Sequence, residues 1–166
     1  AVAGGYKAGK SAATYAAAGK SQVALPVSVP REMIERFTDP LHRTSGYPYT
    51  QIEHAVRKIM AEHIGPRRTD GGLRTGLEKL RTIERYLDEI KVNDFHELMR
   101  SRETRSILGV GKMMAEAALF RTESRNKPYH HRLDYPEPDN EKWCGLVVLK
   151  KEGDHSSCSF EPITNE

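Results

Sequence analysis

Residues 94–120 read DFHELMRSRETRSILGVGKMMAEAALF, and the predicted architecture is organised around this segment. Its apolar residues recur at the three- and four-residue spacing of one helical face. Asp94 stands where a helix N-cap is expected, and Glu97 follows three residues later, as in a capping box. We therefore predict one long helix from Asp94 to Phe120. Its core face is expected to carry Leu98, Ile107, Leu108, Met113, Met114, Ala117 and Ala118.

Two shorter helical patterns precede the long one. The first runs from about Thr50 to His63, where Gly65 and Pro66 end it, and the second begins near Gly72. Short connections between the three patterns predict an antiparallel three-helix bundle. The expected core faces are Ile52, Ala55, Val56, Ile59 and Met60 in the first helix, and Leu73, Leu77, Leu80, Ile83, Leu87 and Ile90 in the second.

The N-terminal part of the chain predicts two further helices. The alanine-rich run from Ser11 to Ala18 favours a helix that ends at Gly19. A second, short helix is expected over 30–37, and Pro40 is expected to terminate it. A glycine-rich turn is expected to lead into the first of these helices.

Downstream of Pro138 the pattern changes from helical to extended. An apolar run, WCGLVVL at 143–149, is followed by a turn at Gly153-Asp154 and a second extended segment at Ser159-Phe160. These features predict a small β-hairpin that packs on the bundle. The predicted fold class is therefore mainly α, with a glycine-rich turn and helix, then the three-helix bundle and the C-terminal hairpin.

The composition excludes several functional classes. The chain has 166 residues, of which 37% are hydrophobic and 30% are charged, with a formal net charge of +3. The arginines are interspersed with acidic residues, which argues against a nucleic-acid-binding surface. No apolar run approaches the roughly 20 residues of a transmembrane helix. Cys144 and Cys158 lack the spacing of a zinc or iron-sulfur site, so we expect no metal, reduced thiols and a cytoplasmic location.

The segment after the long helix, RTESRNKPYHHRLDYP at 121–136, concentrates charged and aromatic residues. Such a mixture predicts a docking surface or the wall of a site. The arginine side chains either bind a phosphate or carboxylate or pair with neighbouring acids, and His130 is a weak catalytic candidate. The candidate members of the ion pairs are Arg121, Glu123, Arg125, Arg132 and Asp134.

Near the N-terminus, residues 4–11 read GGYKAGKS and satisfy the phosphate-loop pattern Gly-x-x-x-x-Gly-Lys-Ser. Taken alone, this pattern indicates a P-loop nucleotide-binding protein. A phosphate loop, however, normally follows a strand of a parallel sheet, whereas the remaining pattern here is helical and ends in a hairpin. This interpretation is kept as an alternative.

The segment 121–136, together with Trp143, resembles the C-terminal region of the fumarate reductase and succinate dehydrogenase flavoproteins. The spacing from Ser124 to Asp134 is most similar to that in the flavoprotein subunit of adenylylsulfate reductase. The resemblance runs from about Asp94 to Lys151, with a weaker patch at the N-terminus. It implies an FAD-dependent oxidoreductase in which an iron-sulfur partner subunit exchanges electrons with the flavin.

The same resemblance implies that the first glycine-rich turn and helix lie against the isoalloxazine ring of FAD. The positive end of the helix would face the N1 and O2 edge of the flavin, where negative charge accumulates on reduction. Tyr6 and Lys7 fall near substrate-facing positions of the family and are weak catalytic candidates. The implied cofactor-binding residues are Gly4, Gly5, Gly9, Lys10, Ser11 and Ala12.

The resemblance also implies a division of the chain into parts. We expect 1–22 to form the C-terminal edge of an FAD-binding domain, 23–46 a linker with a short helix, 47–137 the bundle, and 138–166 the hairpin and tail. The chain is then the C-terminal piece of a longer enzyme or a split subunit, and another chain supplies the rest of the FAD site. The substrate stays open among adenylylsulfate or sulfite, fumarate or succinate, and other acids. The competing hypothesis is a cofactor-free helical interaction or assembly subunit.

Overall fold

The protein is described by a computed structural model that covers residues 2–19, 28–153 and 155–163. It consists of two compact units, Ala1–Phe37 and Thr38–Glu166, and each is described separately. The prediction of a mainly α fold with a small C-terminal strand pair is confirmed. No helix among the described residues is both long and apolar enough to cross a membrane.

In the first unit, helix α1 extends over Val2–Ala18, and all of its residues are exposed. The predicted end is confirmed, because the Gly19 amide donates to the carbonyl oxygens of Tyr15 and Ala16 at 3.1 and 3.2 Å. The helix begins earlier than predicted and includes the glycines that were expected to form a turn. The alanine-dense run propagates helix, and no proline interrupts residues 2–18.

Helix α2 extends over Ser28–His42 and contains Pro40. The prediction that Pro40 terminates this helix is wrong. Pro40 lies in the last turn, where the loss of one amide donor removes only a terminal hydrogen bond. The Pro40 carbonyl accepts a hydrogen bond from the Val92 amide at 3.1 Å, which anchors this turn to the segment before α5.

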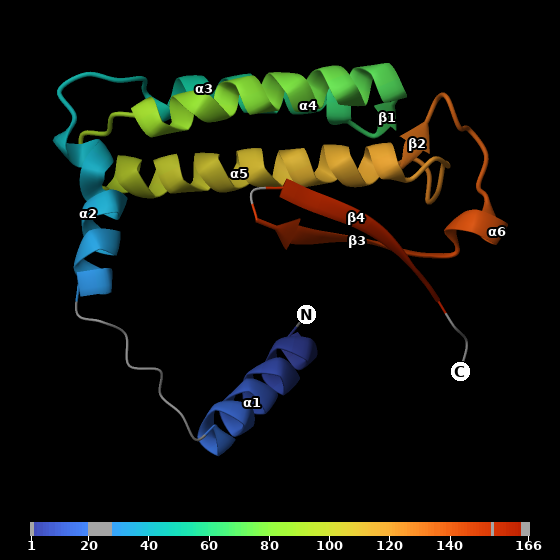
Figure 1. Ribbon diagram of the computed structural model, residues 1–166, viewed down its shortest axis with the longest axis horizontal. Helices are drawn as coiled ribbons and strands as arrows, with labels where there is room; N and C mark the ends of the chain where they lie inside the picture. The colour runs from blue at the N-terminus through green and yellow to red at the C-terminus, as the bar shows by residue number, and fades with distance from the viewer. Residues whose placement is uncertain (1, 20–27, 154, 164–166) are drawn as a thin grey trace. The chain divides into compact units, whose positions relative to one another are not determined.

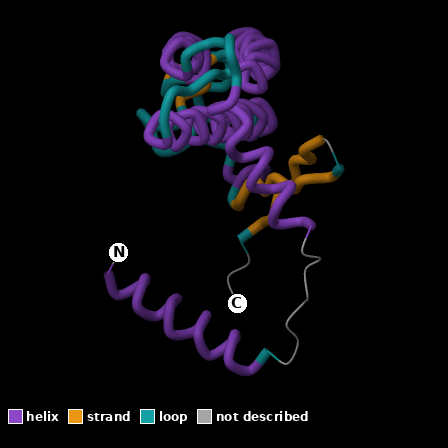
Figure 2. The backbone as a smooth tube through the Cα atoms, turned by 90° about the vertical axis from the view of Figure 1, so that its left-hand side faces the viewer, coloured by secondary structure: helices purple, strands orange, loops and turns teal. Residues whose placement is uncertain are grey.

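The second unit is built around three helices that lie side by side (Figure 1). Helix α3 covers Tyr49–Ile59 and continues into a π-helical turn, η1, at Met60–Ile64. Helix α4 covers Asp70–Glu84 and ends in a 3₁₀ turn, η2, at Arg85–Glu89. Helix α5, over Phe95–Phe120, is the longest, and Figure 2 shows the bundle close to end-on.

The predicted N-terminus of α5 is confirmed. The Asp94 carboxylate accepts the Glu97 amide at 2.8 Å, and the Glu97 carboxylate accepts the Asn93 amide at 2.8 Å. The first bond satisfies a backbone donor that the first turn of a helix leaves unpaired, and the second holds the residue that precedes the N-cap.

The core of the bundle follows the predicted faces closely. Its buried members include Ile52, Val56, Ile59, Leu73, Leu77, Leu80, Leu87, Ile90, Leu98, Leu108 and Ala118. The prediction is wrong for Met113 and Met114, which are 48% and 45% exposed. Because the opposite side of α5 already faces α3 and α4, these side chains lie on the surface that looks toward the hairpin.

The C-terminal hairpin is confirmed as strands β3, Gly145–Glu152, and β4, His155–Pro162. They pair antiparallel, with Val147 opposite Phe160, and Gly153 adopts φ +61° in the turn. A short helix, α6 at Asn140–Trp143, precedes the hairpin. The hairpin packs beside the second half of α5 (Figure 1).

A second, very short strand pair was not predicted. Strand β1, Arg67–Arg68, pairs in parallel with β2, His131–Arg132. Two-residue strands carry no periodic pattern, so the sequence offers no signal for them. This pairing brings the connection between α3 and α4 against the segment that follows α5.

Close packing between η1 and α4 depends on Gly76. A Cβ atom at this position would lie 2.8 Å from the Cβ of His63 and 3.0 Å from Cγ1 of Ile64. Both neighbouring atoms are close to their own backbone, so they cannot move away without shifting η1. A Cβ on Gly109 of α5, in contrast, meets no atom within 4 Å.

We expect Gly76→Ala to lower the free energy of unfolding by about 1–2 kcal/mol, because overpacking outweighs the gain in helix propensity. Gly109→Ala is the matched control and should raise it by up to about 1 kcal/mol. Urea unfolding of both variants measures the difference. Equal effects of the two substitutions would contradict the close contact at Gly76.

Candidate functional site

The candidate site is formed by residues 121–135, which we call the arginine loop. The loop leaves the C-terminus of α5 and ends just after β2. The Arg125 amide donates to the His130 carbonyl at 2.9 Å, and the Tyr129 amide donates to the Asn126 carbonyl at 3.0 Å. Asn126 adopts φ +51°, a left-handed conformation that asparagine tolerates better than most residues. These contacts hold the loop as a tight reversal.

Glu123 is the buried acidic centre of the arginine loop, with an exposed fraction of 0%. Its carboxylate accepts from Arg125 Nε at 2.6 Å and Nη2 at 2.8 Å, from the Asp139 amide at 2.8 Å, and from Arg121 Nη1. Burial alone would raise the pKa of Glu123. The hydrogen bonds from Arg125, the Asp139 amide and Arg121 outweigh burial and hold the pKa below its usual value.

Arg132 is the buried cation of the loop and also has an exposed fraction of 0%. It binds Asp134 through two parallel hydrogen bonds of 2.9 and 2.8 Å. Its Nη1 donates to the carbonyl oxygens of Ala118 at 2.5 Å and Arg121 at 3.2 Å, at the C-terminal end of α5. The guanidinium therefore neutralises helix-end carbonyls as well as one carboxylate.

Asp134 connects this pair to the start of α4. Its Oδ2 accepts the Asp70 amide at 2.7 Å. The hydrogen bonds from Arg132, against an opposing effect of burial, lower the pKa of Asp134 to about 2. The carboxylate is thus ionised while it holds α4 and the loop together.

Arg121 joins the arginine loop to the hairpin. Its Nη1 donates to the Trp143 carbonyl at 3.0 Å, and its Nη2 donates to the Gly145 carbonyl at 2.7 Å. Trp143 is buried, and its ring meets Phe120 and Phe160 edge-on at centroid distances of 5.5 and 5.4 Å. Polar and aromatic contacts at this point therefore bind α5 to β3 and β4.

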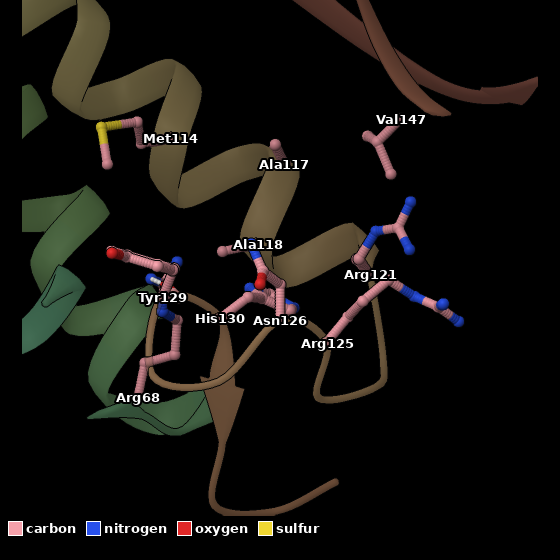
Figure 3. A pocket seen from close by; sticks show the side chains of 10 residues that line it. All are labelled: Arg68, Met114, Ala117, Ala118, Arg121, Arg125, Asn126, Tyr129, His130 and Val147. Carbon is pink, nitrogen blue, oxygen red and sulfur yellow. Dashed lines mark hydrogen bonds between the residues drawn. The ribbon is translucent and has the colours of Figure 1, made fainter. Parts of the chain in front are cut away.

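A pocket of about 370 Å³ opens between the second half of α5, the arginine loop and β3 (Figure 3). Its polar lining comes from Arg68, Arg121, Arg125, Asn126, Tyr129 and His130, and its apolar lining from Met114, Ala117, Ala118 and Val147. Arg68 was not singled out from the sequence, because only the β1–β2 pairing brings it to the loop. Met114 reaches the pocket because it lies on the exposed side of α5.

His130 lies at the pocket among positive charges. Burial, followed by repulsion from Arg68, Arg121 and Arg132, lowers the pKa of His130 to about 4. The imidazole is therefore neutral at physiological pH. Its Nε2 is buried without a hydrogen-bond partner among the described residues.

In the structure, the predicted cofactor-binding residues of α1 belong to one continuous helix. At 100° per residue, Gly5, Gly9 and Ala12 share one face, whereas Gly4, Lys10 and Ser11 lie elsewhere around the helix. The amides of Ser11 and Ala12 lie beyond the first turn, so they are not free to face a ligand. A continuous helix also contradicts a phosphate loop at residues 4–11.

The weak catalytic candidates fall in different units. Tyr6 and Lys7 are exposed on α1, whereas His130 belongs to the second unit. Within the described ranges, no cluster of histidine, cysteine or acidic side chains could hold a metal ion. Cys144 is exposed, Cys158 is partly buried, and neither forms a disulfide.

We expect Glu123→Gln to lower the free energy of unfolding by about 3 kcal/mol, because it leaves two partly buried arginines without their carboxylate. Glu103→Gln is the control, since Glu103 pairs with Arg100 at the surface and its loss should cost less than about 1 kcal/mol. Urea unfolding at neutral pH compares the variants. Similar losses for both would show that the Glu123 network contributes no more than a surface pair.

The lowered pKa of His130 should make the free energy of unfolding depend on pH. Its pKa is about 4 in the folded state and about 6.5 when unfolded, so the unfolded chain binds more protons between these values. Its contribution is fully present above pH 6.5 and should be lost as the pH falls to about 4. Asp134 should add a further loss between about pH 4 and 2.

The His130→Gln variant tests this dependence, since its unfolding free energy should fall less steeply than that of the wild type between pH 6.5 and 4. NMR titration of the His130 ring measures its pKa directly. An observed value of 6.5 or higher would contradict the described environment of the ring.

Comparisons with known proteins agree with this architecture. The family model described as "Fumarate reductase flavoprotein C-term" matches residues 53–166. An uncharacterized FAD-dependent oxidoreductase of Methanocaldococcus jannaschii is 37% identical over 102 residues, which cover 61% of this chain and 18% of that protein. The fumarate reductase flavoprotein subunit of Helicobacter pylori is 31% identical over 113 residues, which cover 65% of this chain and 16% of that protein.

Among solved structures, adenylylsulfate reductase from Archaeoglobus fulgidus has the same fold, with a TM-score of 0.87 and 23% identity. That match covers 95% of this chain and 28% of the Archaeoglobus chain. The matched part of the chain therefore spans less than a third of each of these three proteins. The family match covers more than half of the residues of this chain. It includes helices α4 and α5, the arginine loop and the described hairpin. The chain belongs to the family of fumarate reductase flavoprotein C-terminal domains.

Proposed function

We propose that this chain is the C-terminal part of the flavoprotein subunit of an FAD-dependent oxidoreductase. The observation that supports this proposal is the family match over 53–166, which includes the buried ion pairs of the arginine loop. In the proposed enzyme, electron pairs pass between a substrate and the flavin, and an iron-sulfur partner subunit exchanges electrons with the flavin. Adenylylsulfate or sulfite and fumarate or succinate are the candidate substrates.

The proposed role of α1 is to contact the flavin. Gly5, Gly9 and Ala12 form a face of small residues, and a Cβ on Gly5 or Gly9 would meet no atom within 4 Å. Such a face allows the backbone to approach a planar ring closely. Gly4, Lys10 and Ser11 flank this face, and Lys7 would offer a positive charge to an acidic substrate. In this proposal, 1–22 is the edge of an FAD-binding domain whose remainder comes from another polypeptide segment.

The proposed roles of the other parts follow from their packing. The bundle and hairpin belong to one compact unit, and the Glu123 and Arg132 networks connect them. When bound, FAD would supply the redox chemistry, while this chain would support one wall of the cofactor site. The proposed domain limits, 23–46 for the linker, 47–137 for the bundle and 138–166 for the hairpin and tail, stay predictions.

Purification of the chain from its native cells, under mild conditions and through an affinity tag, tests the proposal. We expect a hetero-oligomeric, yellow complex with the absorbance bands of an oxidised flavin, and FAD in the denatured extract. A colourless, monomeric chain would instead support the alternative, a cofactor-free helical assembly subunit. Reduction of the bound flavin by sulfite with AMP, or by succinate, then separates the candidate substrates.

A pair of substitutions on α1 sharpens the test. We expect Gly9→Leu to reduce the FAD content of the complex at least about tenfold, because the side chain blocks close approach of the ring. Ala18→Leu is the matched control, since it lies on the opposite face of α1 and should leave FAD content unchanged. Equal FAD content in the two variants would contradict a flavin contact at Gly9.

A further inference from the structure

The arginines that line the pocket beside the arginine loop outnumber the carboxylates that pair with them among the described residues. Arg121 and Arg125 share the single buried carboxylate of Glu123. Arg68 takes part in none of the ion pairs formed by the described residues, although it is only 9% exposed. Its Nη2 donates to the Tyr129 carbonyl at 2.9 Å, and its Nε is buried without a partner.

A buried guanidinium without an anion is unfavourable, because burial removes water that would otherwise solvate its charge. Burial and repulsion from Arg132 accordingly lower the pKa of Arg68. His130, which also lines the pocket, is neutral at physiological pH and supplies no negative charge. In Figure 3 the Arg68 side chain extends from β1 toward His130 and Tyr129 at the pocket. The pocket wall therefore carries the charge of Arg68 with no anion beside it among the described residues.

The opposite side of the pocket is apolar. Met114 and Ala117 of α5 and Val147 of β3 line it, and Met114 is 45% exposed. A small inorganic anion would leave these side chains in contact with water. A ligand that combines an anionic head with a short hydrocarbon body would satisfy both sides, because it pairs with Arg68 and covers the apolar wall.

We propose that this pocket binds a small organic carboxylate, with the carboxylate group at Arg68 and the hydrocarbon body against Met114 and Val147. The planar fork of an arginine matches a carboxylate. The volume of about 370 Å³ lies near the lower limit of small-molecule sites, which favours a ligand of few carbon atoms. This inference concerns the second unit alone and does not depend on the proposed flavin contact.

Titration of the full chain with sodium butyrate, followed by NMR at constant ionic strength, tests this inference. We expect saturable shifts confined to the arginine loop, α5 and β3, with a dissociation constant on the order of millimolar. The bound carboxylate should raise the pKa of His130 above its value of about 4, since it opposes the repulsion from Arg68, Arg121 and Arg132. Butanol and inorganic phosphate are the ligand controls.

Two pairs of variants locate the site. Arg68→Met should weaken butyrate binding at least about tenfold, whereas Arg105→Met, which alters a surface arginine paired with Asp88, should not change it. Met114→Glu should abolish binding by repulsion of the carboxylate, whereas Met113→Glu, at the adjacent exposed position outside this pocket, should leave it intact. Because Met114 is exposed, its substitution keeps the test valid even if Arg68→Met fails to fold.

Each remaining outcome overturns the proposal in a defined way. Phosphate that binds as tightly as butyrate would contradict the role of the apolar wall. Butanol that binds as tightly would contradict the role of Arg68. Binding that survives Met114→Glu would place the ligand elsewhere, and the absence of saturable shifts up to about 100 mM butyrate would exclude a carboxylate site.

Discussion

The neutralisation of Arg132 inside the protein is the constraint on which the second unit depends. A fully buried guanidinium is tolerated only if its donors are satisfied, and here Asp134 and the last carbonyls of α5 satisfy them. Asp134 in turn accepts an amide at the start of α4. A single buried cation thus connects the end of one helix, the start of another and strand β2.

A second buried charge extends this connection to the hairpin. Glu123 is held by Arg121 and Arg125, and Arg121 also donates to carbonyls at Trp143 and Gly145. Two buried ions of opposite sign therefore lie within one short loop, and each is paired locally. This arrangement explains why a region so rich in charge packs as part of the core. It also leaves Arg68 as a buried cation with no carboxylate partner among the described residues.

The bundle and the arginine loop stabilise the fold through different interactions. Apolar stripes on α3, α4 and α5 supply the hydrophobic core, while directional hydrogen bonds of the arginine loop determine where the hairpin attaches. The pocket lies where the exposed side of α5 meets the arginine loop.

The amino-acid sequence by itself determined the three bundle helices, the N-cap at Asp94, the end of α1 at Gly19 and the hairpin, because each depends on neighbours within a few residues. The predictions that Pro40 ends a helix and that Met114 is buried were wrong, because the environments of both residues depend on which surfaces meet. Only the tertiary structure brought Arg68 to His130 and left its charge without a carboxylate. That juxtaposition joins residues about sixty positions apart through a two-residue strand pair, and no local pattern encodes such a contact.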